Sequence, residues 1–367
     1  MNRIQISKKE LKKAVKILNK VVPKRSTKPI LEHVILEWET PNLTQIYATS
    51  WGQSIKLRLE AETEGQAKIL VLFADLKTLS KGKGTDFVQI EFDGERALFI
   101  DNAIRTYKDV KDIEEYPESE NFLSNFGPMP EDFISHFNMA VRYSAIEASR
   151  YAIGGVNFDS KGICGTDGKR LVFLKHDADW IDKPMILPAN LAELLKIADK
   201  DYGLSGMQYL DTKDRISFVG DNVCIWSQLV EGTFPRYREV FPNESGYHPL
   251  RFNKEEMVSA LKQLIPHSGP DEYKGMEIRI NGQLNLKVRN DEGQYTEATL
   301  PGGYDHPSRG DNEFTLGIDP RYMLPAIQDF NESEMMIVFE DDETINDKPF
   351  LWNNSGSKLI VMPISGF

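Results

Sequence analysis

Few side chains in this sequence have the types and spacing that catalysis or metal binding requires. The six histidines are scattered, and none has a second ligand four residues away, as in a helical zinc-binding pair. The densest acidic run, residues 340–343, lacks the glycine and the ligand spacing of a calcium loop. The sequence therefore predicts a protein without catalysis, metal or cofactor. A hydrolase that binds a metal ion through the acidic run remains the enzymatic alternative.

Composition limits the class of protein further. The chain has 367 residues, of which 40% are hydrophobic, so it can form two or three domains with sizeable cores. A net charge of -12 argues against a basic protein that simply coats nucleic acid. Cys164 and Cys224 lie inside apolar runs and are expected to be buried, reduced thiols. No signal peptide or membrane span is apparent, so a cytoplasmic location is expected.

The basic residues are segregated in spite of the acidic total. A helix expected over residues 8–22 has one apolar face and one lysine face, with a capping box formed by Ser7 and Glu10. Lys8 and Lys12 are expected beside this lysine face. Such a surface attracts phosphates and positions a nucleic acid without reading its sequence. For any single helix, the simpler interpretation is that its lysines are merely solvated. The residues expected to face a phosphate backbone are Lys9, Lys13, Lys16, Lys20, Lys24, Arg25, Lys77, Lys81, Lys196 and Lys200.

The elements that carry these residues recur in order. The succession helix, strands, helix, strands occurs three times with a period of roughly 120 residues, which indicates a repeat. Segments 112–130 and 234–249 resemble linkers between the repeats. The prediction is an α+β protein of three similar domains, at residues 1–121, 122–246 and 247–367. The alternative is an α+β protein whose elements alternate by chance. Helices are expected over residues 8–22, from about 75, from about 131, within 186–200, over 254–265 and over 320–330.

One stretch, residues 150–176, has the character of a docking surface. Apolar runs are separated by turn signals, and Gly168 can take the positive φ that a tight turn requires. No nucleophile and base are paired here. An apolar surface with polar corners is better suited to binding a peptide than to breaking a bond.

Three segments carry a resemblance to a known family. The run RYAIGGVNFD followed by GTDGKRL resembles the middle domain of the bacterial DNA polymerase III β subunit, the sliding clamp. The segments SQLVEGTFPRYREVFP and LIVMPISGF resemble two later parts of the same family, in the same order. The resemblance implies a head-to-tail homodimeric ring around duplex DNA, with helices lining the inner face and antiparallel sheets outside. It also implies sequence-independent DNA contact and the tethering of DNA polymerase, clamp loader and repair proteins.

The resemblance also implies site residues. Arg150 and Tyr151 match positions near a DNA-contacting loop, although packing accounts equally well for the tyrosine. For Leu171 and Val240, a position in the hydrophobic core is as good an interpretation as a place in the partner groove described next. The residues that match the groove for short partner peptides are Ile153, Thr166, Gly168, Lys169, Arg170, Leu171, Pro235, Val240, Tyr322, Ile360, Val361, Met362, Pro363 and Ile364.

Two departures from the family pattern concern that groove. Glu239 stands where a basic residue is common, and the tail after Pro363 is longer and has no basic residue. A divergent clamp paralogue with a different set of partners is therefore an alternative. For the dimer, Leu264 and Ile265 of one chain are expected to meet the edge strand near Tyr107 of the other.

Overall fold

The structure is a computed structural model that describes residues 2–40, 43–118, 121–123, 126–145, 151–210, 214–243, 247–269, 275–304, 314–330, 334–338 and 348–364. Its contacts divide the chain into two compact units. The first unit contains Met1–Ile134 and Asn190–Leu229, and the second contains Ser135–Ala189 and Val230–Phe367. Each unit combines helices with two antiparallel sheets, so the predicted α+β class is confirmed.

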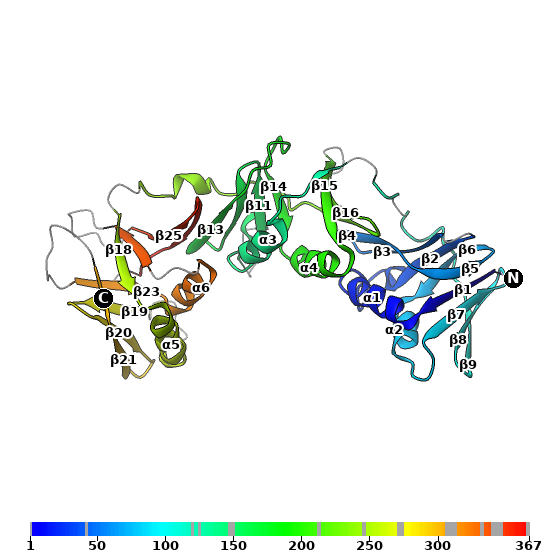
Figure 1. Ribbon diagram of the computed structural model, residues 1–367, viewed down its shortest axis with the longest axis horizontal. Helices are drawn as coiled ribbons and strands as arrows, with labels where there is room; N and C mark the ends of the chain where they lie inside the picture. The colour runs from blue at the N-terminus through cyan, green and yellow to red at the C-terminus, as the bar shows by residue number, and fades with distance from the viewer. Residues whose placement is uncertain are drawn as a thin grey trace. The chain divides into compact units, whose positions relative to one another are not determined.

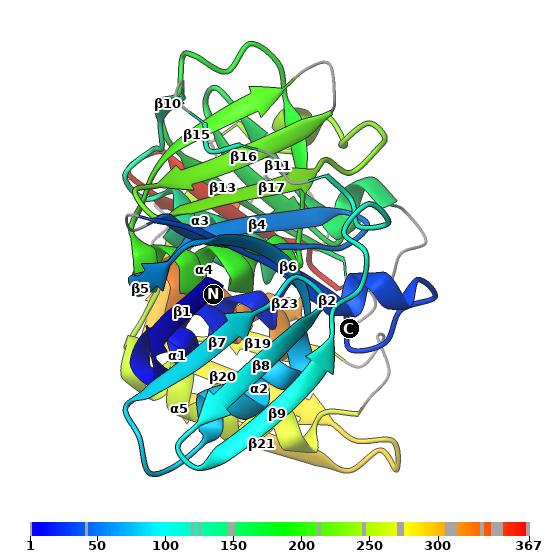
Figure 2. The same cartoon turned by 90° about the vertical axis from the view of Figure 1, so that its right-hand side faces the viewer.

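The first unit is built around a five-stranded and an eight-stranded sheet. Figure 2 shows β7, β8 and β9 side by side, and β9 forms one edge of the five-stranded sheet. The smaller sheet has the order β5 (Ala61–Glu64), β1 (Asn2–Ser7), β7 (Phe87–Phe92), β8 (Arg96–Asp101) and β9 (Ile104–Asp109). The larger has the order β10 (Gly127–Pro128), β15 (Leu204–Leu210), β16 (Arg215–Gly220), β17 (Val223–Gln228), β4 (Gln53–Arg58), β3 (Leu43–Thr49), β2 (His33–Glu39) and β6 (Gln66–Leu72).

Three α-helices belong to the first unit and pack next to one another (Figure 1). The first helix begins as predicted, because Ser7 Oγ accepts a hydrogen bond from the Glu10 backbone N–H at 3.1 Å. It ends four residues earlier than expected, since Asn19 is already its C-cap. The helices are α1 (Lys8–Leu18), α2 (Phe73–Lys81) and α4 (Leu191–Tyr202), with the 3-10 helix η1 (Pro29–Glu32) before β2.

The second unit repeats this design with a nine-stranded and a four-stranded sheet. The larger has the order β14 (Met185–Pro188), β11 (Gly155–Asp159), β12 (Gly162–Thr166), β13 (Arg170–Lys175), β26 (Ser357–Val361), β25 (Phe350–Asn354), β24 (Glu334–Val338), β18 (Tyr247–Phe252) and β22 (Gly302–Tyr304). The smaller has the order β21 (Tyr295–Leu300), β20 (Leu284–Arg289), β19 (Met276–Ile280) and β23 (Phe314–Ile318). The helical segments are α5 (Lys254–Leu264), α6 (Pro320–Phe330), α3 (Phe133–Val141, whose first two residues fall in the first unit), η2 (Tyr151–Gly154), η4 (Tyr237–Glu239) and η6 (Ile265–His267).

The middle third of the chain is shared between the two units. Strand β17 pairs with β4, which continues the sheet of the first unit. Strand β13 pairs with β26, which continues the sheet of the second. Both sheets therefore cross the predicted boundaries at 121 and 246, which explains why contacts define two units rather than three. The three-domain division remains a prediction based on the repeat.

The two segments expected to be linkers are packed against the units in part. Tyr116 is buried, its hydroxyl donates to the His33 carbonyl at 2.9 Å, and it accepts from the Thr49 N–H at 3.2 Å. Phe234 and Tyr237 are buried in the second unit. These aromatic side chains anchor segments whose acidic and proline-rich composition had suggested free linkers.

Several local predictions are confirmed. Both cysteines are buried, reduced thiols, as expected. The sequence Asp93-Gly94 and the sequence Asn281-Gly282 also favour hairpin turns, and both glycines have positive φ, 111° and 84°, between β7 and β8 and between β19 and β20. The expected position of Lys8 beside the lysine face is wrong. Its side chain is buried and forms an ion pair with Asp101. Across the described ranges, no helix is both long enough and apolar enough to cross a bilayer.

Candidate partner-binding groove and basic surface

The turn between β12 and β13 is held by its own side chains. Thr166 Oγ1 accepts from the Gly168 N–H at 3.1 Å and donates to the Arg170 carbonyl at 2.8 Å. Asp167 Oδ1 accepts from the N–H groups of Lys169 and Arg170, both at 3.0 Å. Gly168 takes the expected positive φ, 88°. The turn therefore presents Lys169 and Arg170 from a rigid frame.

Arg170 is fixed between two tyrosine rings. Its Cζ lies 4.9 Å from the ring centroid of Tyr143 and 4.8 Å from that of Tyr322. Its Nε donates to Asp167 Oδ2 at 2.9 Å, and one terminal nitrogen donates to the Arg142 carbonyl at 2.9 Å. The guanidinium is thus oriented before any partner arrives, which lowers the entropy cost of binding.

The C-terminal segment lies along the same turn. Strand β26 pairs with β13 so that Ile360 faces Leu171 in the register. Beyond the strand, the Met362 N–H donates to the Lys169 carbonyl at 2.8 Å, and the Ile364 N–H donates to the Gly317 carbonyl at 2.9 Å. These backbone bonds hold the segment that contains Met362, Pro363 and Ile364 beside the turn.

An aromatic cluster lies under Leu171 and Ile360. The rings of Phe173 and Tyr237 stack with centroids 5.8 Å apart, and Phe241 lies edge-on at 6.0 Å from Phe173. Tyr237 and Phe241 flank the segment with Val240, so this cluster joins the loop after β17 to β13 and β26. Three segments far apart in sequence, each with predicted groove residues, are thereby brought together.

The predicted groove residues divide into an exposed and a buried set. Val240 and Met362 are 46% and 37% exposed, so both side chains are accessible to a second molecule. Pro235 and Lys169 are also exposed. The buried members, which support the surface from beneath, are Ile153, Thr166, Leu171, Ile360 and Val361.

A separate cavity of about 440 Å³ lies beside the groove segment, with Pro235 in its lining. Asp159 lies in its wall and accepts hydrogen bonds from Tyr237 at 2.8 Å and from Arg238 at 2.9 and 3.0 Å. Burial raises the pKa of the Tyr237 hydroxyl, so this bond is present at every physiological pH. The network fixes the loop that presents Pro235 and Val240.

Glu239 is exposed at this loop and lies 3.1 Å from Arg236 in an ion pair. Both side chains are well solvated, so the pair contributes little stability. The carboxylate therefore remains available at the rim. Of the longer tail, Ile364 is placed as above, whereas residues 365–367 lie outside the described residues.

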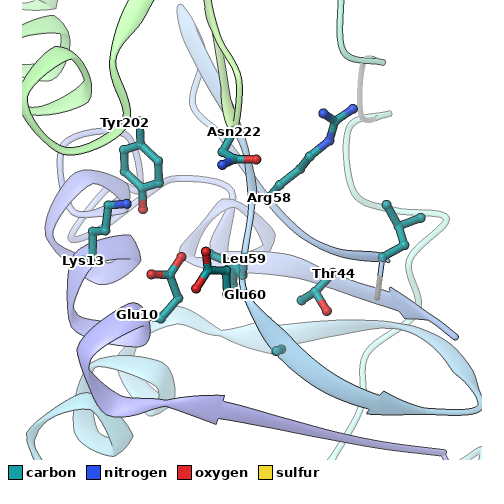
Figure 3. A pocket seen from close by; sticks show the side chains of 10 residues that line it. Glu10, Lys13, Thr44, Arg58, Leu59, Glu60, Tyr202 and Asn222 are labelled. Atoms are coloured by element: carbon teal, nitrogen blue, oxygen red, sulfur yellow. The ribbon is translucent and has the colours of Figure 1, made fainter. Parts of the chain in front are cut away.

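The lysine face of α1 is partly neutralised by α4. Lys16 and Lys20 form ion pairs with carboxylates of α4 at N–O distances of 2.7 and 3.5 Å. Lys13 Nζ lies 4.0 Å from the ring centroid of Tyr202. Figure 3 shows these two side chains at the edge of a pocket that Glu10 and Glu60 also line. This side of the helix is therefore a weaker site for phosphates than composition alone suggests.

The remaining predicted phosphate-facing residues differ in what the structure shows of them. Lys77 donates to Asn19 Oδ1 at 2.9 Å. Arg150 lies outside the described residues, and Tyr151 is described only as the first residue of η2. Residues that are exposed and form no ion pair within the described part of the chain are Lys9, Lys24, Arg25, Lys81, Lys196 and Lys200.

The residues expected at a dimer contact differ in exposure. Tyr107 lies on the edge strand β9 and is 65% exposed, as is its neighbour Ile104 at 67%. Leu264 is 2% exposed because it packs in the core of its own unit, and Ile265 is partly exposed. Of this pair, Ile265 has more surface to offer a second chain.

Sequence reasoning missed Tyr143 and the aromatic cluster. Tyr143 is fully buried, and its hydroxyl donates to Asp329 Oδ2 at 2.9 Å. Its partners are 27 and 186 residues away along the chain, so no local pattern indicates the contact. Asp167 had a signal, since an aspartate before glycine in a turn usually accepts backbone N–H groups.

The described residues do not include the acidic run on which the hydrolase alternative rests. Within the part of the chain that the structure describes, no group of three or more His, Cys, Asp or Glu side chains is placed to hold a metal ion. The acidic run at 340–343 lies outside the described residues.

Solved structures of other proteins have the same fold as this chain. The fold is that of bacterial sliding clamps. The β subunit of Streptococcus pyogenes DNA polymerase superposes with a TM-score of 0.85 at 13% identity, covering 99% of this chain and 100% of that one. A Caulobacter crescentus β sliding clamp superposes with a TM-score of 0.84 at 19% identity, covering 100% and 99%.

Sequence similarity leads to the same family. Residues 2–120 match the family model described as DNA polymerase III beta subunit, N-terminal domain. The beta sliding clamp of Streptomyces coelicolor is 26% identical over 99% of both chains. That of Haemophilus influenzae is 24% identical over 92% of this chain and 93% of its own. The predicted resemblance to the bacterial DNA polymerase III β subunit is therefore confirmed.

Proposed function

We propose that this protein is a DNA sliding clamp, the processivity factor that keeps a replicative DNA polymerase on its template. The observation that carries the proposal is full-length similarity: relatives called beta sliding clamp align over nearly the whole chain, and solved clamps share its fold. The protein would act by tethering and not by catalysis. It would work in the cytoplasm, where bacterial DNA is replicated.

The ring is part of the proposal. Three repeats in each of two chains would close head to tail, since a heterologous contact repeated by rotation forms a closed ring. Among the strands that the structure describes, β9 has a partner on one side only, and so has β21 in the second unit. Unpaired strand edges are ready to add another strand. The dimer would therefore join β9 of one chain to the β21 and Ile265 region of the other.

Contact with duplex DNA would be electrostatic and weak. Lys9, Lys24, Arg25 and Lys196 have exposed ammonium or guanidinium groups, while the ion pairs of Lys16 and Lys20 limit the total positive charge. Phosphate contacts of this kind do not read sequence and weaken as salt rises. A closed ring needs no tight grip, because its topology retains the DNA while weak contacts allow sliding.

Partner proteins would bind the groove through short extended peptides. Val240 and Met362 would contact apolar side chains of the peptide, and the preoriented Arg170 would bind its polar groups. The Caulobacter crescentus clamp has a polyethylene glycol bound in its beta-motif tethering region. DNA polymerase, clamp loader and repair proteins are the partners that the family resemblance implies.

The test of the clamp is retention on circular DNA. The protein is loaded on nicked circular duplex by a clamp loader, salt is raised to screen phosphate contacts, and the circle is then cut. Retention on the circle and loss after cutting are expected. Equal loss from circular and linear DNA in high salt would contradict the proposal and leave ordinary electrostatic binding.

The test of the groove uses exposed residues so that folding is not at risk. Met362→Ser and Val240→Ser are expected to weaken binding of an apolar peptide from the host's replicative polymerase by about tenfold each. Phe87→Ser, at an exposed aromatic residue of β7 that belongs to neither the groove nor the proposed dimer contact, is the control. Unchanged peptide affinity in both groove variants, measured by fluorescence anisotropy, would contradict this site.

Glu239 favours a second version of the proposal, a clamp with a changed set of partners. Its carboxylate at the rim would repel acidic peptides that a basic residue would attract. Glu239→Lys should then improve binding of acidic peptides selectively across a peptide panel. An unchanged ranking of the panel would remove the reason to treat the protein as a divergent paralogue.

A further inference from the structure

Trp51 differs in exposure from Trp38 and Trp226, the other tryptophans of the first unit. Its side chain is 64% exposed, whereas Trp38 and Trp226 in the same unit are 1% and 0% exposed. Tryptophan is the residue that gains most from leaving water, so an exposed indole at the tip of a turn is a candidate for contact with a partner.

The turn that presents Trp51 is rigid. The Ser50 N–H donates to the Gln53 carbonyl at 2.7 Å, and Ser50 Oγ donates to the same carbonyl at 3.2 Å. Gln53 Nε2 donates to Asn190 Oδ1 at 2.9 Å, which ties the turn to the start of α4. The backbone that holds the indole is therefore ordered in advance, so little entropy is lost when a ligand stacks on it.

One cationic group lies on the indole, and two more are in the same loop. Lys28 Nζ lies 4.3 Å from the ring centroid of Trp51 and covers one of its faces. Lys24 and Arg25, in the same loop as Lys28, are exposed and form no ion pair within the described residues. The one carboxylate nearby in sequence, Glu32, already accepts from the Ser26 N–H at 3.1 Å. The surface thus combines an aromatic face with an excess of positive charge.

We propose that Trp51 stacks on an unpaired base of single-stranded DNA while Lys24, Arg25 and Lys28 contact the adjoining phosphates. A base can stack on an indole only when its own face is uncovered, which occurs in a single strand or at the end of a duplex. Inside a duplex both faces of each base are covered by neighbours. Aromatic faces beside basic groups are the general means of binding single strands without sequence preference.

This inference rests on the proposed function and deepens it, because it adds single-stranded DNA next to the duplex that the clamp would encircle. Trp51 would mark the boundary between single-stranded and double-stranded DNA. The indole has one face free of Lys28, so one base is expected to stack.

The experiment measures tryptophan fluorescence of the full chain during titration with oligothymidylate and with a duplex of equal length. Stacking is expected to quench the Trp51 signal much more strongly with the single strand than with the duplex, whose only uncovered base faces are at its two ends. Trp51→Ala should weaken single-strand affinity, measured by anisotropy with a labelled oligonucleotide, by about 5- to 150-fold. Trp51→Phe should retain part of the affinity. Phe87→Ala, another exposed aromatic of the same unit, is the control and should bind as the wild type does.

Either of two results would overturn the inference: unchanged single-strand affinity in Trp51→Ala, or equal quenching by duplex and single strand. The retention assay on nicked circles separates this inference from the clamp itself. Trp51→Ala should stay on the closed circle as the wild type does, so loss of single-strand affinity with normal retention supports both proposals. If the wild-type protein leaves the closed circle but still binds single strands through Trp51, only the clamp proposal is overturned.

Discussion

Lys8 is the first residue of α1, and its ammonium is turned into the protein. Its Nζ lies 2.6 Å from Asp101 Oδ1, and Thr85 Oγ1 donates to the same carboxylate oxygen at 3.0 Å. The hydrogen bond from Lys8 lowers the pKa of Asp101 below its usual value. This ion pair joins α1 to the end of β8 inside the first unit.

Lys8→Met is expected to lower the free energy of unfolding by about 3–5 kcal/mol, because it leaves Asp101 buried without its partner. The measurement is urea denaturation followed by circular dichroism. Lys9→Met, one residue further on the exposed side of α1, should change the value by less than about 0.5 kcal/mol. If Lys8→Met behaves like Lys9→Met, the pair has no structural role. The double variant Lys8→Met with Asp101→Leu should recover most of the loss.

His33 is a second buried polar residue of the first unit. Its Nδ1 lies 3.2 Å from the Pro29 carbonyl oxygen. Burial, and then the charge of Lys111, lower the pKa of the imidazole below 6.5. The folded protein therefore favours the neutral ring, and the unfolded chain takes up a proton more readily.

The sign of the pH effect follows from this lowered pKa. The contribution of His33 to stability is complete above pH 6.5 and is lost as the pH falls through the lowered value. The wild type should lose more unfolding free energy than His33→Asn between about pH 7.5 and pH 5. His267→Asn, at an exposed histidine, should keep the wild-type slope. Parallel slopes for wild type and His33→Asn would refute the assignment.

At the scale of elements, the Tyr116 side chain anchors the segment that follows β9. The Tyr116 hydroxyl bonds both the His33 carbonyl and the Thr49 N–H, and Lys111 bridges to Leu70 of β6. Tyr116 also packs edge-on against Tyr47, with ring centroids 6.1 Å apart. The segment consequently runs along the eight-stranded sheet rather than free of it.

Tyr116→Phe should cost about 1–3 kcal/mol of unfolding free energy, because a buried N–H and a buried carbonyl lose their partner. It should also speed cleavage within residues 112–130 by a nonspecific protease. Tyr107→Phe removes the same hydroxyl from an exposed ring and should leave both measurements unchanged. Equal cleavage rates in the two variants would show that the hydroxyl does not anchor the segment.

At the scale of the whole molecule, the proposed dimer depends on the edge strand β9. Ile104 and Tyr107 are the exposed apolar residues on that strand. Exposed apolar side chains on an unpaired edge favour association with another strand.

Tyr107→Asp is expected to yield monomers of 41.8 kDa in light scattering, whereas the wild type should have twice that mass. Leu264→Lys is a poorer test, because Leu264 is buried and the charge would unfold the unit. Phe87→Asp adds the same charge at an exposed site on β7, which is not an edge strand, and should remain dimeric. A dimer that survives Tyr107→Asp would place the contact elsewhere.

Features set by neighbouring residues were predictable from the sequence. Helix α6 has the predicted bounds, Ser7 caps α1, and Gly168 forms the expected turn. Periodicity and turn chemistry act within a few residues, so they are visible in a short window. Strand β1 had such a signal in Ile4 and Ile6, which alternate and are buried, although the prediction overlooked it.

Features that depend on distant segments were not predictable in this way. Strand β17 pairs with β4 although the two lie far apart in the chain, so no local pattern indicates this pairing. Lys8 and Lys16 have the same side chain on one helix, yet one is buried beside Asp101 and the other lies on the surface against α4. The family resemblance indicated which segments form the groove, but the exposure of Met362 and the burial of Leu171 depend on packing between β13, β26 and the aromatic cluster. Burial and pairing are properties of contacts across hundreds of residues, and local sequence patterns do not encode those contacts.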